Sequence, residues 1–314
     1  MLDSSISVWR LPFPFPGRPF SRHFNLNHVN IIMNNMLAAA YEVAKIERTK
    51  HADLTQRLDV YRNTLEPYFY SHLVENYGTM LQEFWESYSP PLESEHAYVI
   101  VERRAHPNFR FVLQNMAWAA PHMAVYIFCS DENLAFIKAI LGDKVESFHL
   151  IDIFFGDVSR EEGKTGYNKT MTSYHTYQLI AAKYILTIQM DNIIRRKIPA
   201  SMFVGDYWGN PWAWRSDAAG GGGATVRRVE AMIEMCITHR PDPLVGIPSL
   251  EDAWVAERTR VFPPFEFRRA HLMESVPAEN PVILHQFWTF ADAYLQRTRE
   301  EAVAYWTHLL TLSD

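Results

Sequence analysis

The feature that most constrains the fold of this chain is a run of strand-forming residues, YILTIQMDN at positions 184–192, that ends in polar side chains. A short apolar run bounded by polar residues predicts a buried central strand of an α/β sheet. Ligands of such sheets bind beyond the carboxyl ends of the strands. Gln189 and Asp191 are therefore expected to face a metal ion or a phosphate. The alternative is that Asp191 caps the next helix or forms a turn.

Strand-like and helix-like segments alternate before this run. The predicted strands are 96–101, 125–128 and 148–155, and the predicted helices are 108–118, 133–141 and 174–183. This alternation predicts an α/β fold with a doubly wound, mostly parallel sheet flanked by helices. Arg103 and Arg104 follow the first strand, where a uridine or a pyrophosphate would lie, and a solvated strand end is the alternative.

The first 90 residues predict a different organisation. Positions 8–24 are rich in proline and aromatic residues, which predicts an extended arm that cannot be helical. Apolar residues then recur at helical spacing over 27–50, 54–65 and 67–88, before two consecutive prolines. We therefore predict an arm plus an all-helical N-terminal unit in residues 1–90. The α/β domain would occupy 91–314 and end in an amphipathic helix over 290–311.

Composition excludes several classes of protein. The 314 residues are 48% hydrophobic and 21% charged with a net charge of −6, which predicts a soluble globular protein and argues against a general nucleic-acid binder. The two cysteines, Cys129 and Cys236, cannot form a disulfide framework and lack zinc-site spacing. No apolar run reaches the roughly 18 residues of a membrane span. No signal peptide is recognisable, so a cytoplasmic protein is expected.

Four further motifs follow the central strand. They are Gly209-Asn210-Pro211-Trp212, the glycine run 220–223, the pair Glu251-Asp252, and His285 close to Trp288. The glycine run is predicted to form a loop that leads into a helix over 225–238 and lets a ligand approach the backbone. The alternative is a flexible surface loop. For Asp252 the alternative is a capping interaction with Ser249 at a helix start.

The order of these motifs resembles that in one family of GT-A-like glycosyltransferase domains. That family is itself an uncharacterised domain of unknown function. The resemblance covers about residues 95–290. The matching segments are 101–108, 126–130, Gln189/Asp191, 209–212, 220–227, Glu251/Asp252 and His285/Trp288. Two segments depart from the family: Gly-Asn-Pro-Trp at 209–212 replaces Gly-Ala-Pro-Trp, and Ala-Thr-Val-Arg at 224–227 replaces Phe-Ser-Leu-Arg. These departures point to a different acceptor.

The resemblance implies a metal-dependent glycosyltransferase. It would move a sugar from a nucleotide diphosphate sugar, expected to be UDP-linked, to an acceptor hydroxyl with inversion at the anomeric carbon. Asp191 and His285 would bind Mn²⁺ or Mg²⁺, and a histidine ligand favours Mn²⁺. The alternative for His285 is a packed core histidine. Asp252 would be the catalytic base, with Glu251 as the second candidate.

The other implied site residues fall into two groups. The nucleotide-sugar site would comprise Glu102, Arg103, Arg104, Asn133, Tyr167, Asn168, Gln189, Asp191, Gly221, Gly222 and Gly223. The acceptor pocket would comprise Trp208, Trp212 and Trp288.

Two other function classes stay open at this point. The first is a non-catalytic binding or scaffold protein built on a decayed transferase fold. The second is a metal-dependent hydrolase, which would need more carboxylates near Asp191 than the sequence shows. The sugar, the acceptor and the oligomeric state are not determined by the sequence.

Overall fold

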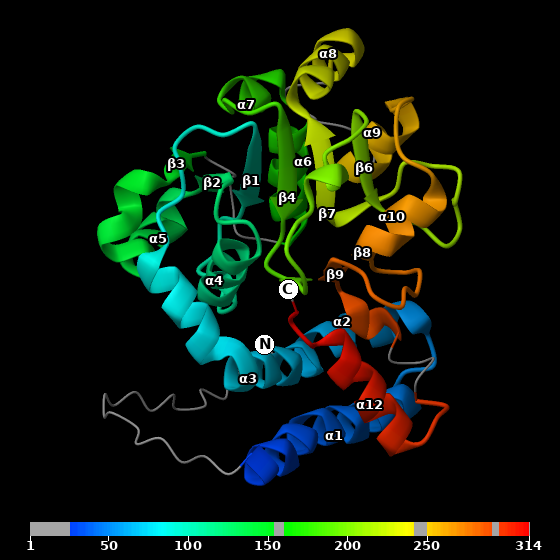
Figure 1. Cartoon of the computed structure of the whole chain (residues 1–314). Coiled ribbons are helices and arrows are strands. Elements are labelled where there is room, and N and C mark those ends of the chain that lie inside the picture. Colours follow the sequence, from blue (N-terminus) through cyan, green and yellow to red (C-terminus); the bar gives the residue numbers. More distant parts are fainter. Residues whose placement is uncertain (1–25, 154–159, 242–249, 291–294, 314) are drawn as a thin grey trace, which may run out of the picture.

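The computed structural model describes residues 26–153, 160–241, 250–290 and 295–313. Its centre is a six-stranded sheet in the order β3-β2-β1-β4-β7-β6 (Figure 1). The strands are β1 (His96–Val101), β2 (Ala124–Cys129), β3 (His149–Asp152), β4 (Tyr184–Ile188), β6 (Tyr207–Asn210) and β7 (Gly221–Arg228). The arm predicted over residues 8–24 lies outside the described residues.

The strand that opens the 184–192 run, β4, lies inside the sheet, as predicted. β1 pairs in parallel with β2 and β4, and β3 pairs in parallel with β2. Only β7 runs the other way, antiparallel to β4 and β6. Side chains alternate between two cores, since Tyr98 and Ile100 enter one and Ala97 and Val99 enter the other. The predicted class, an α/β fold with a mostly parallel sheet flanked by helices, is confirmed.

Helices cover both faces of the sheet (Figure 1). They are α4 (Phe109–Ala119), α5 (Asp131–Leu141), α6 (Arg160–Met171), α7 (Tyr174–Gln178), α8 (Val229–His239), α9 (Glu251–Arg258) and α10 (Phe265–His271). Short 3-10 turns lie at Gly142–Ser147, Ala200–Met202 and Phe287–Phe290. The helix predicted over 174–183 ends at Gln178. The backbone N–H of Lys183 instead bonds to the carbonyl of Glu95, just before the paired strands β1 and β4 begin.

The glycine run is not the predicted loop. Residues Gly221–Arg228 form β7, and the following helix begins only at Val229. The prediction of a helix from Thr225 is wrong because β7 has a neighbour on each side, with Thr225 opposite Thr187 of β4 and Gly209 of β6. Two hydrogen-bond ladders satisfy the backbone of this segment, which outweighs the poor strand propensity of glycine.

The N-terminal helices are α1 (Leu26–Lys50), α2 (Leu54–Thr64) and α3 (Glu66–Ser87), and α12 (Arg299–Leu309) packs among them. Phe69 of α3 contacts both Phe287 and Trp306, with ring centroids 4.6 and 5.3 Å apart. The same core continues into α4 and one face of the sheet. Of the helix predicted over 290–311, α12 covers Arg299–Leu309 and begins at a capping box of Thr298 and Glu301, while residues 291–294 lie outside the described residues.

A second, three-stranded sheet stands at the carboxyl end of β4. Its strands are β5 (Asn192–Ile194), β9 (Ile283–His285) and β8 (Leu272–Met273). Because β5 starts directly after Asp191 and Asn192 pairs with His285, this small sheet brings a distant part of the chain to the end of the central strand.

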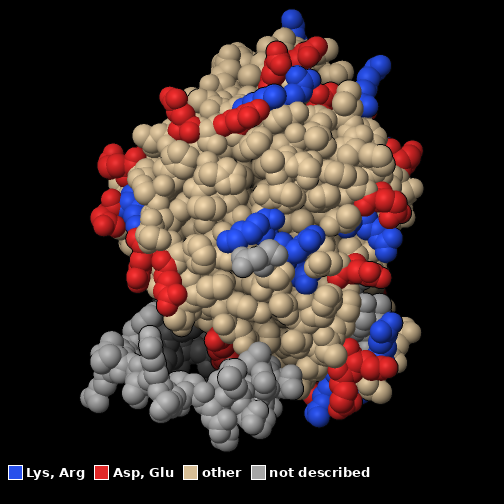
Figure 2. Space-filling view, viewed as in Figure 1, with Lys and Arg blue, Asp and Glu red and all other residues tan. Residues whose placement is uncertain are grey.

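Charge is dispersed over the face of the molecule in Figure 2, where acidic and basic side chains lie mostly at the rim and a few basic ones lie near the middle. The face shows no broad basic surface of the kind that binds nucleic acid. Among the helices that are described, none is long and apolar enough to cross a membrane.

We expect limited proteolysis to leave α1–α3 attached to the rest of the chain. These helices share one buried core with α4, α12 and the sheet, so their release would expose apolar side chains to water. Mass spectrometry of the fragments tests this expectation, and a stable fragment that begins near residue 92 would contradict it.

Candidate active site

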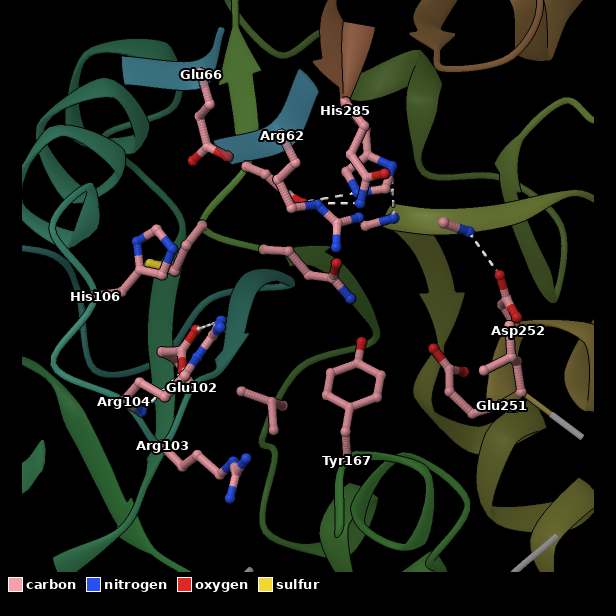
Figure 3. A pocket seen from close by; sticks show the side chains of 18 of the residues that line it. Arg62, Glu66, Glu102, Arg103, Arg104, His106, Tyr167, Glu251, Asp252 and His285 are labelled. Carbon is pink, nitrogen blue, oxygen red and sulfur yellow. Dashed lines mark hydrogen bonds and ion pairs between the residues drawn. The ribbon is translucent and has the colours of Figure 1, made fainter. Parts of the chain in front are cut away.

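A cavity of about 630 Å³ opens at the carboxyl ends of β1 and β4 (Figure 3). Most of the predicted site residues line it: Glu102, Arg103, Arg104, Tyr167, Asn168, Gln189, Asp191, Gly222, Gly223, Glu251, Asp252 and His285. Residues predicted for the nucleotide, for the metal and for the base therefore face one space. This is the position at which α/β sheets of this kind bind ligands.

Asp191 and His285 face each other in this cavity. Asp191 Oδ1 and His285 Nε2 are 3.3 Å apart, and neither atom has a well-aligned hydrogen bond among the described residues. The other oxygen, Asp191 Oδ2, accepts a 2.9 Å bond from the side chain of Gln286. On the far side of the ring, His285 Nδ1 lies 3.3 Å from Glu274 Oε1. His285 thus stands between two carboxylates, which a packed core histidine does not need.

Electrostatics hold this group in its charged form. Burial alone would lower the pKa of His285, but the charges of Asp191 and Glu274 raise the pKa to about 10. Burial opposes ionisation of Asp191, and the charge of His285 overcomes that effect and brings the pKa of Asp191 below its usual range. The N–H of Gly223 also points at Nδ1, at 3.2 Å. Because Nδ1 cannot accept that bond while donating to Glu274, we assign its proton to the Glu274 contact.

The described residues include no cluster of three or more metal-binding side chains, so a cation in this cavity would have only the predicted pair, Asp191 and His285, as protein ligands. Two ligands about 2.1 Å from one ion and about 100° apart are separated by about 3.3 Å. Asp191 Oδ1 and His285 Nε2 have this separation. Glu274 holds the opposite ring nitrogen, which is the usual support of a metal-binding histidine. The donor set fits an ion whose remaining ligands come from a substrate and water.

Each of three consecutive glycines of β7 accommodates a neighbouring side chain. A Cβ on Gly221 would collide with Asp252 and Trp212, a Cβ on Gly222 with Glu274, and a Cβ on Gly223 with His285. Gly222 also has φ of +90°, which other residues rarely adopt. The run is thus glycine because site side chains pack directly on its backbone.

Asp252 is the carboxylate that faces the cavity from α9. Its Oδ2 accepts a 2.9 Å bond from the N–H of Gly222, and its Oδ1 accepts a 2.7 Å bond from the N–H of Ala253. The capping alternative named Ser249, which lies outside the described residues; the residue at the N-cap is Leu250, without a side-chain cap. Asp252 therefore links the helix start to the glycine strand and still lines the cavity.

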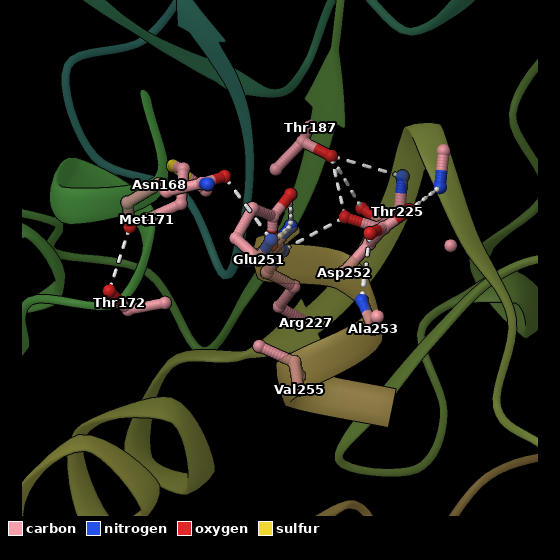
Figure 4. A network of polar contacts seen from close by, with 12 residues as sticks. Asn168, Met171, Thr172, Thr187, Thr225, Arg227, Glu251, Asp252, Ala253 and Val255 are labelled. Carbon is pink, nitrogen blue, oxygen red and sulfur yellow. Dashed lines mark hydrogen bonds and ion pairs between the residues drawn. The ribbon is translucent and has the colours of Figure 1, made fainter. Parts of the chain in front are cut away.

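Glu251 is tied to a buried arginine beneath the cavity (Figure 4). Arg227 Nη2 donates to both Glu251 oxygens at 3.0 and 3.1 Å, while Arg227 Nε bonds to Thr225 and Nη1 to Tyr177. Burial raises the pKa of Glu251 to about 7, and the charge of Arg227 opposes that rise. The paired geometry favours the carboxylate form of Glu251. It also places Glu251 in a buried ion pair, which Asp252 does not form with any described residue.

The part of the cavity that was predicted to bind the nucleotide lies where β1 ends. Glu102 accepts two side-chain bonds of 2.8 Å from Arg104, from Nε and Nη2. Arg103, next to it, lines the cavity, and the hydroxyl of Tyr167 reaches Gln189 from α6. Asn168 lines the cavity too, and its Oδ1 accepts a bond from the N–H of Glu251.

Five predicted residues are not among those that line the cavity: Asn133, Gly221, Trp208, Trp212 and Trp288. Asn133 is fully buried, caps α5 with Ser130 and bonds to the carbonyl of Glu102, so it supports the end of β1 instead of touching a ligand. Trp208 is fully buried against Phe267. Trp288 is 1% exposed. Neither tryptophan is positioned to bind an acceptor, because alternation in β6 and the packing of the 3-10 turn at 287–290 turn both rings into the core.

Trp212 has a different position from the other two tryptophans. Its ring lies against Gly221, close to the carboxylate of Asp252, although it does not line the cavity itself. Trp214 stacks on it with ring centroids 5.8 Å apart and is 70% exposed. Sequence reasoning missed Trp214, although two tryptophans spaced by one residue were visible in the sequence.

Sequence reasoning also missed the contribution of the N-terminal helices. The cavity is lined by four side chains from the end of α2 and the start of α3, Asp59, Arg62, Asn63 and Glu66. Burial and the charge of Asp191 raise the pKa of Glu66 to about 7, which places its carboxyl near the same centre. No motif marks these positions; only the tertiary packing of α2 and α3 on the sheet identifies them.

One family model matches part of the chain. A family described as a protein of unknown function, DUF5672, matches residues 154–276, about two fifths of the chain. That match includes Asp191 and Asp252 and excludes His285 and the N-terminal helices. No curated protein matches in sequence.

Among solved structures, the apo form of the glycosyltransferase GlyE from Streptococcus pneumoniae TIGR4 is 11% identical, with a TM-score of 0.42, over 68% of this chain and 63% of that chain. Another GlyE structure is 12% identical, with a TM-score of 0.42, over 69% and 62%. Mouse xyloside xylosyltransferase 1 is 10% identical, with a TM-score of 0.41, over 61% and 97%. The chain spans about three fifths of the GlyE structures.

Replacing the buried arginine should destabilise the protein strongly. Arg227→Met leaves Glu251 buried without its partner, and we expect the free energy of unfolding to fall by about 3–5 kcal/mol. Denaturant unfolding measures this. Arg228→Met is the matched control, because Arg228 pairs with Asp206 at the surface and should cost about 1 kcal/mol or less. Equal losses for the two variants would contradict the role given to the buried pair.

Proposed function

We propose that the protein is a glycosyltransferase that moves a sugar from a nucleotide diphosphate sugar, UDP-linked, to an acceptor hydroxyl with inversion. One observation carries this proposal: the Asp191–His285 pair and the carboxylate of Asp252 face one cavity across a strand of glycines. Sugar transfer needs a cation for the departing diphosphate and a base for the incoming hydroxyl. The cavity offers one candidate for each role.

The donor would lie across the ends of β1 and β4. Arg103 and Tyr167 line the cavity at the β1 end, where they would contact the nucleotide. Arg104 lines the same end and is held by Glu102. The diphosphate would then reach the Asp191–His285 pair at the β4 end. Gln189 lines the wall between the two. A cavity of about 630 Å³ is within the range of small-molecule and cofactor sites.

A divalent ion, Mn²⁺ or Mg²⁺, would be bound by Asp191 Oδ1 and His285 Nε2. When bound, it would neutralise charge on the departing diphosphate. His285 Nε2 must lose its proton to act as a ligand, so the affinity for the ion should increase with pH. Gln286 and Glu274 would orient the two ligands from behind, because each bonds to the atom that faces away from the ion.

The acceptor hydroxyl would approach from the side of Asp252. The bond from Gly222 fixes the carboxylate at the cavity wall. Trp212 and the exposed Trp214 lie on that side, and flat aromatic rings suit the apolar faces of a sugar acceptor. Glu251 remains the second candidate for the base, and its pairing with Arg227 makes it the weaker one.

Removing the carboxylate of Asp191 should impair metal use. For Asp191→Asn we expect Mn²⁺-dependent affinity for UDP to fall by about tenfold or more, since one of two protein ligands loses its charge. Calorimetry with and without Mn²⁺ measures this. Asp217→Asn, at an exposed aspartate, is the control and should match the parent. Unchanged Mn²⁺-dependent affinity in Asp191→Asn would rule out the metal assignment.

A panel of nucleotide sugars identifies the donor by the nucleotide released in the presence of Mn²⁺. With that donor, Asp252→Asn should lower the transfer rate by about 10²–10⁴, the range for loss of a general base. Donor affinity should hardly change, because the Asn oxygen can still accept the bond from Gly222, whereas loss of the bond from Ala253 should lower the melting temperature slightly. A rate within a factor of about three of the parent would reject this role.

Glu251→Gln is the paired variant for this experiment. It should lower stability more than rate, because Arg227 loses its partner. A parent protein that binds a nucleotide sugar but turns over no donor would favour the non-catalytic binding protein instead.

A further inference from the structure

Arg62 extends from the last turn of α2 into the cavity (Figure 3). Its Nε is buried and has no hydrogen-bond partner in the part of the chain that the structure describes. The neighbouring helix is fixed in place, because the hydroxyl of Tyr70 lies 3.0 and 3.2 Å from the carbonyl oxygens of Met190 and Asn192, on both sides of Asp191. Arg62 is therefore held in the cavity by the packing of the helical unit.

The surroundings of Arg62 identify where its charge acts. It lines the same cavity as Glu66 and Asp191, so it stands close to the end of β4. Arg104 also lines the cavity, but its Nε and Nη2 already donate hydrogen bonds to the carboxylate of Glu102. Arg62 Nε has no hydrogen-bond partner among the described residues, and the side chain lies in the same cavity as the Asp191–His285 pair. The planar guanidinium group suits bidentate binding of a phosphate group.

We infer that Arg62 binds the diphosphate of the donor opposite the Asp191–His285 pair. Arg62 would stabilise the negative charge that develops on the departing diphosphate, from a helix outside the α/β domain. The inference rests on the proposed transferase function for the identity of its ligand. It makes the helical unit part of the active site. The rival explanation is that Arg62 is only a structural counter-ion for Asp191 and Glu66.

Inorganic pyrophosphate and uridine are the probes, because they separate the diphosphate from the nucleoside. Calorimetry on the full chain with Mn²⁺ present should show that Arg62→Gln binds pyrophosphate about tenfold or more weakly, since charged hydrogen bonds are lost. Uridine affinity should stay at the parent value. Arg110→Gln, at an exposed arginine of α4, removes the same charge elsewhere and should leave both affinities unchanged.

Arg62→Lys is the second variant, in case Arg62→Gln is too unstable to measure. It keeps the charge and loses the planar fork, so we expect weaker pyrophosphate binding with a smaller loss. A structural counter-ion would lower the melting temperature without changing the ratio of pyrophosphate to uridine affinity.

Pyrophosphate affinity equal to the parent in both Arg62 variants, or a parent that does not bind pyrophosphate, would overturn the inference. Failure of the transferase function has a different signature. The parent would bind pyrophosphate through Arg62 but would bind neither uridine nor any nucleotide sugar.

Discussion

The ion pair between Asp191 and His285 is the contact on which the site depends. It joins residues 94 positions apart at the end of the central strand. The pair forms because β5 and β9 align Asn192 with His285, and because Gln286 and Glu274 fix the outer atoms of both side chains. Two opposite charges buried together need such support, since desolvation would otherwise exceed their attraction. The same support leaves Oδ1 and Nε2 facing each other in the cavity.

The glycine strand is the second constraint. An ordinary strand would fill the space beside the pair with its own side chains. Here Asp252, Glu274 and His285 pack directly on the backbone of β7, and two of them, Asp252 and His285, line the same cavity. Below them, the buried Arg227–Glu251 pair joins β7 to the start of α9 and sets the position of Asp252. Precision of this kind is what a base and a metal site require of their supporting residues.

The helical unit has a larger part than its position in the chain suggests. It shares one core with the sheet and the C-terminal helix. It also contributes a basic side chain, Arg62, and an acidic one, Glu66, to the cavity wall. The matched family region, residues 154–276, contains neither of these residues nor His285. The cavity is thus completed by segments from both sides of that region, which explains why an isolated α/β domain would present an incomplete site.

The sequence by itself determined the alternation of strands and helices, the central place of residues 184–188 and most residues of the cavity wall. Local periodicity is enough for the strands and helices, and the resemblance to a glycosyltransferase family indicated most of the cavity residues. Only the tertiary structure decided that the glycines form a strand, because ladder partners on both sides override local propensity. It also decided that Trp208 and Trp288 face the core and that α2 reaches the cavity. Those outcomes depend on which elements pack together over long sequence separations, and no local pattern in the chain encodes that choice.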